Sequence, residues 1–455
     1  MTKNLKPNYI STTNACKLCT PLGAALAFKG IEGAVPYLHG SQGCATYMRR
    51  YIISHFNEPI DIASSSLSEK HAVYGGGPNL KLGLMNVTKK YQPKLIGIAT
   101  TCLTETIGDD VRLFLHEYDR EVAGDKPLMV QVSTPSYNGT HMEGFHDAVA
   151  SVVDTLAGKD DKKPDTGDTI NILPGFVSPA DIRYLKEIVA DYGLNATILP
   201  DISETMDGTA AKTYEKIQSG GTPLSVIKAM GDSLASLEFG HTMAEESAGA
   251  ILKERFQVPQ EQMPLPMGIT ASDRFFQTLA ELSGQPTPSK HVLERGRLVD
   301  SYVDGHKYIY GKRAIVYGEE DFVVGLCAFL AEIGVMPVLC ASGGKSGKLA
   351  EKISEATSDI LPEQPQVFEG MDFFDISEMA EELAPDLLVG HSKGYPLARK
   401  LEIPMIRVGF PIHDRMGGQR ILHLGYRGAQ SLFDMVVNAM IARKQSDSPI
   451  GYSYM

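Results

Sequence analysis

Short apolar segments alternate with helix-period segments along most of this 455-residue chain. The apolar segments lack the polar alternation of a half-exposed sheet, which is typical of strands covered by helices on both faces. The pattern therefore predicts an α/β fold with mostly parallel sheets. The clearest strand candidates are LIGIATTC (95–102), PLMVQVSTP (127–135), TINILPGF (169–176), NATILPD (195–201), RAIVYGEE (313–320), MPVLCAS (336–342), DLLVGHS (386–392) and MIRVGFP (405–411).

Two of the intervening segments carry clear helix signals. In 176–194, Ser178 is placed to cap a helix, Pro179 suits its first turn, and Gly193 follows as a stop. The segment 319–337 is apolar nearly all round, so we expect a buried helix there.

Composition predicts two domain boundaries. One is the charged segment AGKDDKKPDTGD (157–168), and the other lies near SYVDGHKYIYGKR (301–313), just before a new strand. With a length that suits about three domains of roughly 150 residues, we expect α/β domains at 1–165, 166–305 and 306–455, the last with a C-terminal helical segment. The first is expected to bind a cluster.

The charge pattern and the termini exclude several classes of protein. The formal net charge is -12 and no Lys/Arg-rich run is present, which argues against nucleic-acid binding. The N-terminus resembles no signal peptide, and no stretch has the 18 or so apolar residues of a membrane span. We therefore expect a cytoplasmic protein without membrane contact, whose thiols stay reduced.

Three cysteines lie in separate loops of the N-terminal part of the chain. Cys19 opens CTPLGAALAFKG, Cys44 ends the glycine-rich HGSQGC, and Cys102 directly precedes LTETIGDD. Each falls at a predicted helix start, where backbone N–H groups and the helix dipole stabilise a thiolate. An iron–sulfur cluster usually takes four thiolates. The three cysteines therefore predict a metal cluster that a second chain completes.

The other cysteines have plainer interpretations. Cys327 and Cys340 lie in apolar runs and are expected in the core, because free cysteine is among the most buried residue types. Cys16 forms a Cys-x-x-Cys pair with Cys19, but no second pair completes a zinc site and no convincing strand precedes it. Cys16 is interpreted as a spare thiol or an alternative ligand.

Ser136, Asp109 and Asp110 have two interpretations each. The Ser136 hydroxyl follows a predicted strand, so it either reaches a cluster iron or caps the next turn, and capping is preferred. The two aspartates are expected to cap or charge a helix start, with surface docking as the alternative.

The remaining loop motifs identify no catalytic site. HSKG (391–394) and GFPIHDRMGGQR (409–420) follow strands and could cradle an anion, although neither matches a phosphate-binding signature. His39, His391 and His413 are loop histidines, expected at the surface or in hydrogen bonds.

Several blocks resemble the β-type chains of the nitrogenase component 1 superfamily. The combination of HGSQGC with TTC-x-x-E-x-IGDD is highly specific, and the matching blocks run in order from about residue 16 to residue 430. The resemblance implies three Rossmann-like domains, an α2β2 heterotetramer with an α-type partner, and an iron–sulfur cluster at the α/β interface. The blocks are CTPLGAALA, HGSQGCATYMRRY, AVYGG, TTCLTETIGDD, STPSYNGTH, VGHSKG and RVGFPIHDR.

The same resemblance implies roles for individual residues. Cys19, Cys44 and Cys102 match the three β-chain positions that ligate the P-cluster, and Ser136 matches the serine that approaches it. Tyr74, in AVYGG, matches the aromatic position near the docking surface for the iron protein. Since the large cofactor sits in the α-type chain of this family, we expect none of its ligands here.

Within the superfamily, the chain looks most like NifN, the β-like half of the NifEN scaffold on which the iron–molybdenum cofactor matures. Its first cluster cysteine follows only 18 residues, and IHDRMGGQRILHLGYRG stands where catalytic β chains carry a His-rich or bulkier stretch. This resemblance implies a scaffold with no turnover of its own and a [4Fe–4S] cluster at the interface. It also implies a NifE-type partner that holds the cofactor precursor, a precursor-donating assembly protein, and docking of the iron protein near Tyr74.

The alternative is the catalytic β subunit of a nitrogenase, possibly an alternative one, with half of an eight-iron P-cluster. The scaffold cluster needs one ligand from this chain, at Cys44, whereas the chain keeps all three cysteines. The number of ligands and the size of the cluster therefore stay open. A third interpretation, an α/β binding protein with incidental core thiols, predicts a colourless protein.

Overall fold

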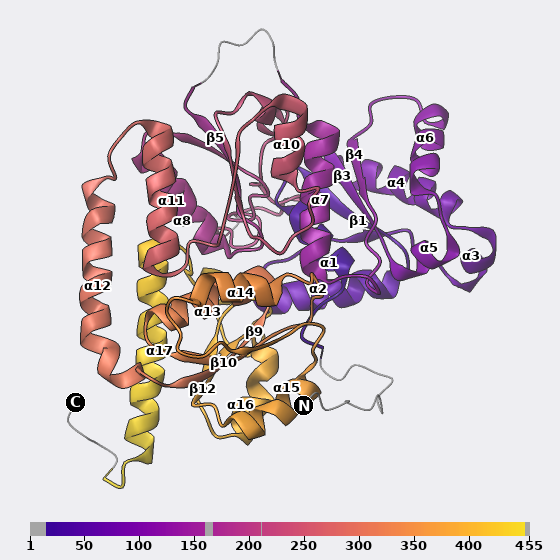
Figure 1. Ribbon diagram of the computed structural model, residues 1–455. Coiled ribbons are helices and arrows are strands. Elements are labelled where there is room, and N and C mark those ends of the chain that lie inside the picture. The colour runs from indigo at the N-terminus through magenta and orange to yellow at the C-terminus, as the bar shows by residue number, and fades with distance from the viewer. Residues whose placement is uncertain (1–14, 160–166, 211, 451–455) are drawn as a thin grey trace.

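Three parallel sheets, each built from one stretch of the chain, organise the molecule (Figure 1). The computed structural model describes residues 15–159, 167–210 and 212–450. All pairings between its strands are parallel. This arrangement confirms the predicted α/β fold class.

The first sheet has the order β2-β1-β3-β4, with β1 (Ala34–His39), β2 (Ala63–Ser64), β3 (Leu95–Thr100) and β4 (Leu128–Val132). The second has the order β6-β5-β7-β8, with β5 (Thr169–Leu173), β6 (Asn195–Ile198), β7 (Ser236–Phe239) and β8 (Gln260–Met263). The third has the order β11-β10-β9-β12-β13, with β9 (Arg313–Gly318), β10 (Met336–Ser342), β11 (Gln366–Phe368), β12 (Leu387–Gly390) and β13 (Met405–Arg407).

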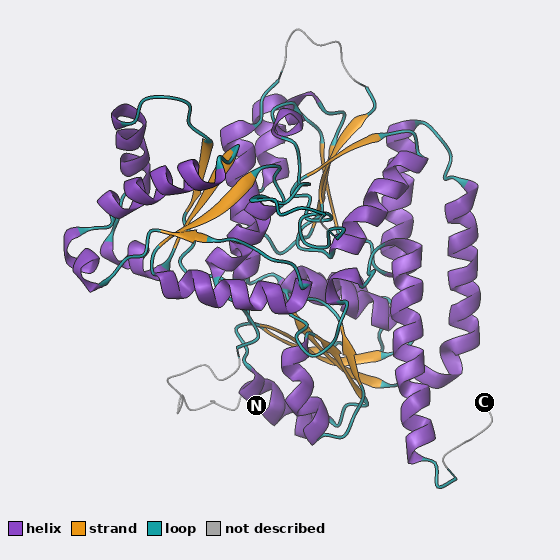
Figure 2. Cartoon of the chain, turned by 180° about the vertical axis from the view of Figure 1, so that it is seen from behind, coloured by secondary structure: helices purple, strands orange, loops and turns teal. Residues whose placement is uncertain are grey.

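Helices cover the sheets on both faces (Figure 2). Around the first sheet these are α1 (Thr20–Lys29), α2 (Gln42–Phe56), α3 (Glu69–Tyr74), α4 (Gly77–Tyr91), α5 (Cys102–Ile107), α6 (Val111–Glu121) and α7 (His141–Leu156). The middle of the chain adds α8 (Pro179–Asp191), α9 (Leu224–Ile227), α10 (Ala248–Phe256), α11 (Gly268–Ser283), α12 (Ser289–Ile309) and the 3-10 helix η1 (Met230–Asp232). The last third adds α13 (Glu320–Glu332), α14 (Leu349–Thr357), α15 (Phe373–Leu383), α16 (Tyr395–Lys400), α17 (Gly425–Asp447), η2 (Ser392–Gly394) and η3 (Gly418–Arg420).

Strand β1 shows why such segments are apolar throughout. Ala34 and Leu38 belong to the core that includes Phe28 of α1, whereas Val35 and Tyr37 pack in a separate cluster with α4 and α6. Successive side chains of a strand point to opposite faces, so a sheet covered twice needs apolar residues at every position.

Eight of the strands fall within the eight predicted runs, and Ser178 caps α8 as expected, accepting from the N–H of Asp181. Helix α13 is buried along most of its length, as its composition predicted. Sequence reasoning missed β1, β2, β7, β8 and β11. Strand β1 contains Pro36, and β8, at the edge of its sheet, is the polar run QEQM.

The domain limits stay predictions. Most of the first predicted boundary, 160–166, lies outside the described residues. Residues 301–309 are the end of α12 rather than a linker. One continuous core joins residues of all three sheets. The C-terminal helix α17 packs beside α11 and α12, which come from the middle of the chain (Figure 1). No described helix has the length and apolar character needed to span a bilayer.

Candidate functional site

Cys19, Cys44 and Cys102 all stand at the N-terminal ends of helices, as predicted. Cys19 is the N-cap residue of α1, Cys44 is in the first turn of α2, and Cys102 is the first residue of α5. Cys19 is exposed, the other two are half-buried, and none forms a disulfide. The local sequence explains the helix starts, since Pro21 occupies the first turn of α1 and Ser41 caps α2.

The fold brings the three thiols into one neighbourhood. Burial raises the pKa of Cys44, and the thiols of Cys19 and Cys102 raise this pKa further through like-charge repulsion. Three thiolates so placed repel one another unless a positively charged centre lies among them. Cys19, Cys44 and Cys102 therefore form one group of candidate metal ligands at helix N-termini.

Ser136 links two of the three cysteine-bearing helices. Its backbone N–H donates to Sγ of Cys102 at 3.3 Å, and its hydroxyl oxygen accepts from the N–H of Thr20 at 3.1 Å. Ser136 therefore caps α1, 116 positions earlier in the chain. The expectation that it caps the next turn was wrong, because Thr140 caps α7.

A cavity of about 350 Å³ lies beside these residues. We call it the cysteine cavity; its lining includes Cys19, Ser136, Tyr47, Tyr51 and Lys393. The Tyr47 hydroxyl meets that of Tyr51 at 2.8 Å, and Tyr47 is half exposed. The cavity thus combines a thiol, hydroxyl groups and an ammonium group at the surface of this chain.

The donor set suits a cluster better than a single metal ion. Within the described residues, no group of three His, Cys, Asp or Glu side chains is placed to hold one ion. In an iron–sulfur cluster each thiolate binds a different iron, so its cysteines lie farther apart than the ligands of one ion. Cys19, Cys44 and Cys102 are the candidate ligands for such a cluster.

Two glycines fix the position of α1, and with it Cys19. A Cβ on Gly23 would lie 1.7 Å from the carbonyl oxygen of His141, and one on Gly144 would lie 1.9 Å from that of Thr20. Helices α1 and α7 therefore touch backbone to backbone, which only glycine allows.

The other cysteines are buried. Cys327 and Cys340 have no exposed surface, which confirms their predicted place in the core. Cys16 packs with side chains of the third sheet, and its Sγ lies 3.7 Å from Nε2 of His391. Burial raises the pKa of Cys16 to about 12. A thiol so hard to ionise suits the spare-thiol interpretation better than that of a ligand.

The loop aspartates lie at helix starts, and the loop histidines form hydrogen bonds. Asp110 caps α6 as predicted, and Asp109 also lies at a helix start, because it accepts from the N–H of Gly76, the N-cap residue of α4. Asp109 accepts in addition from Nε2 of His39 at 3.0 Å. His39 and His391 are buried and hydrogen-bonded, His391 to Sγ of Cys16, so the hydrogen-bonding alternative holds for both and the surface alternative does not. His413 bonds to Ser54 at 2.6 Å.

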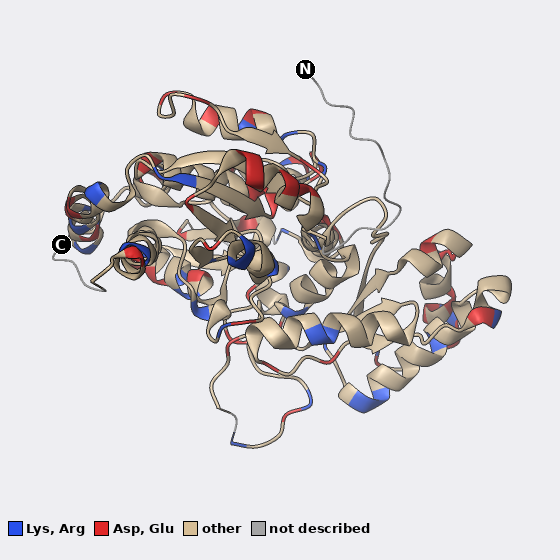
Figure 3. Cartoon of the chain, turned by 90° about the horizontal axis from the view of Figure 1, so that it is seen from below, with Lys and Arg blue, Asp and Glu red and all other residues tan. Residues whose placement is uncertain are grey.

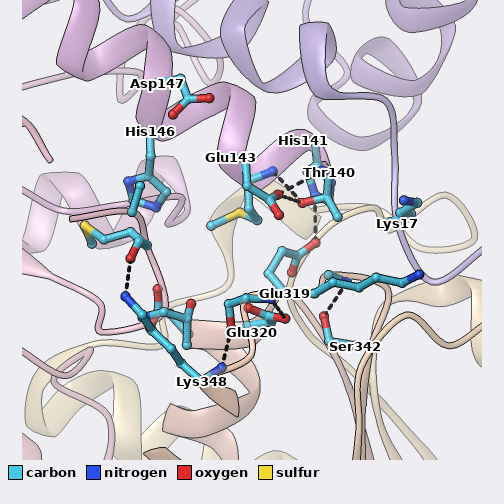
Figure 4. Close-up of a pocket in the computed structure, with 18 of the residues that line it drawn as sticks. Lys17, Thr140, His141, Glu143, His146, Asp147, Glu319, Glu320, Ser342 and Lys348 are labelled. Atoms are coloured by element: carbon cyan, nitrogen blue, oxygen red, sulfur yellow. Dashed lines mark hydrogen bonds and ion pairs between the residues drawn. The ribbon is translucent and has the colours of Figure 1, made fainter. Parts of the chain in front are cut away.

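A second cavity, of about 400 Å³, lies where the three sheets meet (Figure 4). We call it the junction cavity; its lining includes Lys17, Glu143, Asp147, Glu319, Glu320 and Lys348. Burial, followed by repulsion from Glu143, raises the pKa of Asp147 to about 6. Burial raises the pKa of Glu320 to about 7, although hydrogen bonds from Ser346 oppose the shift.

The polar groups of the junction cavity mostly bond to other parts of its wall. Nε2 of His141 meets a carboxylate oxygen of Glu319 at 2.8 Å, joining α7 to the third sheet. Asp321 accepts from the N–H groups of His241 and Thr242, and Nζ of Lys348 donates to the carbonyl of Met243. These bonds tie the three sheets together. Sequence reasoning missed them because the partners lie 79 to 178 residues apart.

Tyr74 is an exposed residue of α3, one of the helices around the first sheet. It ends α3, none of whose residues is buried, and 84% of its surface is exposed, beside Val73 at 77%. Lys, Arg, Asp and Glu are interspersed on the described chain in Figure 3, with no continuous basic face in that view.

Comparisons with known proteins agree with this architecture. The model of the family described as Nitrogenase component 1 type Oxidoreductase matches residues 19–441. The chain is 34% identical over 431 residues to the nitrogenase molybdenum-iron protein beta chain of Clostridium pasteurianum, covering 94% of this chain and 93% of that one. It is 35% identical over 452 residues to the chain of that name from Azotobacter vinelandii, covering 96% and 86%.

Solved structures of nitrogenase chains have the same fold as this chain. A chain of nitrogenase Cp1 at pH 6.5 superposes with a TM-score of 0.95 at 31% identity, covering 100% of this chain and 99% of that one. A chain of nitrogenase Cp1 at pH 5, at 17% identity, covers 98% of this chain and 94% of that one. Its TM-score of 0.71 shows likeness of fold alone.

These names correct one expectation. A scaffold without turnover was expected, but the similar chains are named as parts of an enzyme, nitrogenase, and neither the names nor the matched structures indicate a scaffold. The family match spans nearly the whole chain and includes all three N-terminal cysteines. The chain therefore belongs to the nitrogenase component 1 type oxidoreductase family and is β-chain-like within it.

Proposed function

We propose that this chain is the β-type subunit of a catalytic nitrogenase component 1. We further propose that Cys19, Cys44 and Cys102 hold its half of an interface cluster of the P-cluster type. The observation that carries the proposal is that the three thiols stand at three separate helix N-termini, with Ser136 bonded both to Sγ of Cys102 and to the start of α1 beside Cys19. The names of the similar chains support the enzymatic role.

The proposal includes an α-type partner in an α2β2 assembly. Three thiols leave a cluster short of ligands, and Cys19 is exposed where a second chain can reach the site. A reducing cytoplasmic setting would keep these thiols available.

The chain's own residues do the work of placement. When bound, the cluster supplies one-electron storage and transfer. Helix N-termini stabilise the three thiolates electrostatically. The N–H of Ser136 donates to Sγ of Cys102, which orients that ligand and spreads its charge.

The test is anaerobic co-expression with an α-type partner, followed by iron analysis and an acetylene-reduction assay with iron protein and reductant. For the cofactor-free complex we expect about eight iron atoms per interface, and for the loaded complex acetylene reduction. About four iron atoms per interface without reduction would contradict the catalytic proposal. A complex without iron would contradict the cluster site itself.

We also propose that the iron protein docks around Tyr74. Its exposed ring beside Val73 offers an aromatic and apolar contact of the kind enriched at interfaces. We expect Tyr74→Ala to slow electron delivery about tenfold, as loss of about 1.4 kcal/mol of docking energy would, while the iron content stays unchanged. Stopped-flow measurement of electron transfer checks this, with the exposed Tyr214→Ala as control.

A further inference from the structure

Lys393 reaches the cysteine site from the far end of the chain. It lies in η2, directly after β12 of the third sheet. Its Nζ donates to the carbonyl of Ala15 at 2.9 Å and to that of Lys17 at 3.2 Å. These carbonyls flank Cys16, two to four residues before Cys19. One side chain therefore ties the segment that leads into Cys19 to the third sheet.

The charge of Lys393 is also held close to that site. The side chain is half-buried, lies over the Tyr51 ring at 5.7 Å from its centroid, and lines the cysteine cavity. Burial lowers the pKa of its ammonium, while attraction to Cys16, Glu319 and Cys19 opposes that shift. Because Lys393 and Cys19 line the same cavity, the positive charge lies near a thiol proposed as a ligand.

We propose that Lys393 is a positioning residue of the cluster site, which anchors residues 15–19 and raises the cluster's reduction potential through its charge. The inference rests on the proposed cluster at Cys19, Cys44 and Cys102. It adds a residue of the third sheet to a site otherwise built from the N-terminal part of the chain.

The expected direction follows from electrostatics. Reduction adds one negative charge to the cluster, and a nearby ammonium stabilises the more negative state. This interaction is strong where the cation is partly removed from water, because screening is weaker there. Loss of the charge therefore shifts the potential to more negative values.

The anchoring role has a similar basis. Segment 15–18 is also held by an antiparallel bridge between Ala15 and Asp372, by the burial of Cys16 against the third sheet, and by the bonds of Leu18 with His141. The two bonds of Lys393 add to these contacts on both sides of Cys16. Loss of two charge-assisted bonds to the carbonyls of this segment would loosen the chain just before Cys19.

The experiment uses the α/β complex carrying Lys393→Met, Lys393→Arg or Lys393→Gln, with Lys400→Met as the matched control. Lys400 is exposed, follows seven residues later and pairs with Glu381. Each complex is assayed for iron and titrated with dithionite and mediators while EPR follows the cluster. We expect a negative shift in potential and partial loss of iron for Lys393→Met, and wild-type values for Lys393→Arg and Lys400→Met.

The outcomes separate this inference from the proposed function. Wild-type potential and iron content in Lys393→Met would overturn the inference, as would a shift of equal size in Lys393→Arg. If Lys393→Met fails to assemble, Lys393→Gln decides, because it keeps a donor but no charge: a negative shift supports the inference and an unchanged potential overturns it. A wild-type complex without iron contradicts the proposed function instead.

Discussion

The cysteine cavity and the junction cavity have similar volumes, about 350 Å³ and about 400 Å³, but different chemistry. The cysteine cavity lies beside three thiols at helix N-termini, which carry no disulfide. The wall of the junction cavity uses its polar groups to join the sheets. Of these two, the junction cavity is the larger. The thiols, which form no disulfide, make the cysteine cavity the better candidate for a metal site.

The largest expected effect comes from Cys44. We expect Cys44→Ala in the α/β complex to lose most of the interface iron and the EPR signal, because the cluster would lose one of the three thiolates proposed to hold it. Cys340→Ala, in the buried core, is the matched control and should keep the iron while losing about 1 kcal/mol of stability. Full iron content in Cys44→Ala would remove the distinction between the two cavities.

His141 tests the junction cavity as a structural element. His141→Ala should lower the free energy of unfolding by about 3 kcal/mol, because it leaves the buried carboxylate of Glu319 without its donor. Urea unfolding followed by circular dichroism measures the effect, with the exposed His116→Ala as control. A loss below about 1 kcal/mol, the size of an ordinary hydrogen bond, would show that this bond does not join the sheets.

Replacing Ser136 tests whether its hydroxyl caps α1 or binds the cluster. We expect Ser136→Ala to cost about 1 kcal/mol of stability through loss of the α1 cap, with iron content unchanged, because the backbone N–H to Cys102 remains. Iron analysis and urea unfolding test both parts, with Ser301→Ala on exposed α12 as control. Loss of iron would instead assign the hydroxyl a direct part in the cluster site.

The pH dependence of Asp147 tests the burial of a carboxyl in the junction cavity. Its pKa is raised from 3.8 to about 6 by burial and by Glu143, so the folded state binds the proton more tightly than the unfolded state does. The wild type therefore loses stability relative to Asp147→Asn as pH rises from about 4 to about 6. Thermal unfolding should give the variant the higher Tm at pH 8, and this advantage should shrink toward pH 4. An advantage equal at both pH values would contradict the burial of this carboxyl.

Local features were predictable from sequence, and long-range contacts were not. The apolar runs and the helix starts at Cys19, Cys44 and Cys102 depend on neighbours within a few residues, and the structure has them where predicted. The contact of Lys393 with Ala15 spans 378 positions and leaves no periodic pattern. Asp109 could be expected to cap a helix, but its bond to His39 depends on how two loops of the first sheet meet.

The sequence motifs also could not distinguish a scaffold from an enzyme. The expectation of a scaffold rested on a short N-terminus and on the stretch 412–428, neither of which contains a proposed cluster ligand. The cysteines themselves were compatible with both functions, because a thiolate at a helix N-terminus binds iron in either case. Only comparison over the whole chain corrected it.

Anomalous diffraction at the iron edge, from crystals of the anaerobic α/β complex, tests the central claim most directly. The account predicts iron density within bonding distance of Sγ of Cys19, Cys44 and Cys102, on the side of this chain that faces its partner. Iron in the junction cavity, or Cys44 packed among apolar side chains with no metal nearby, would contradict it.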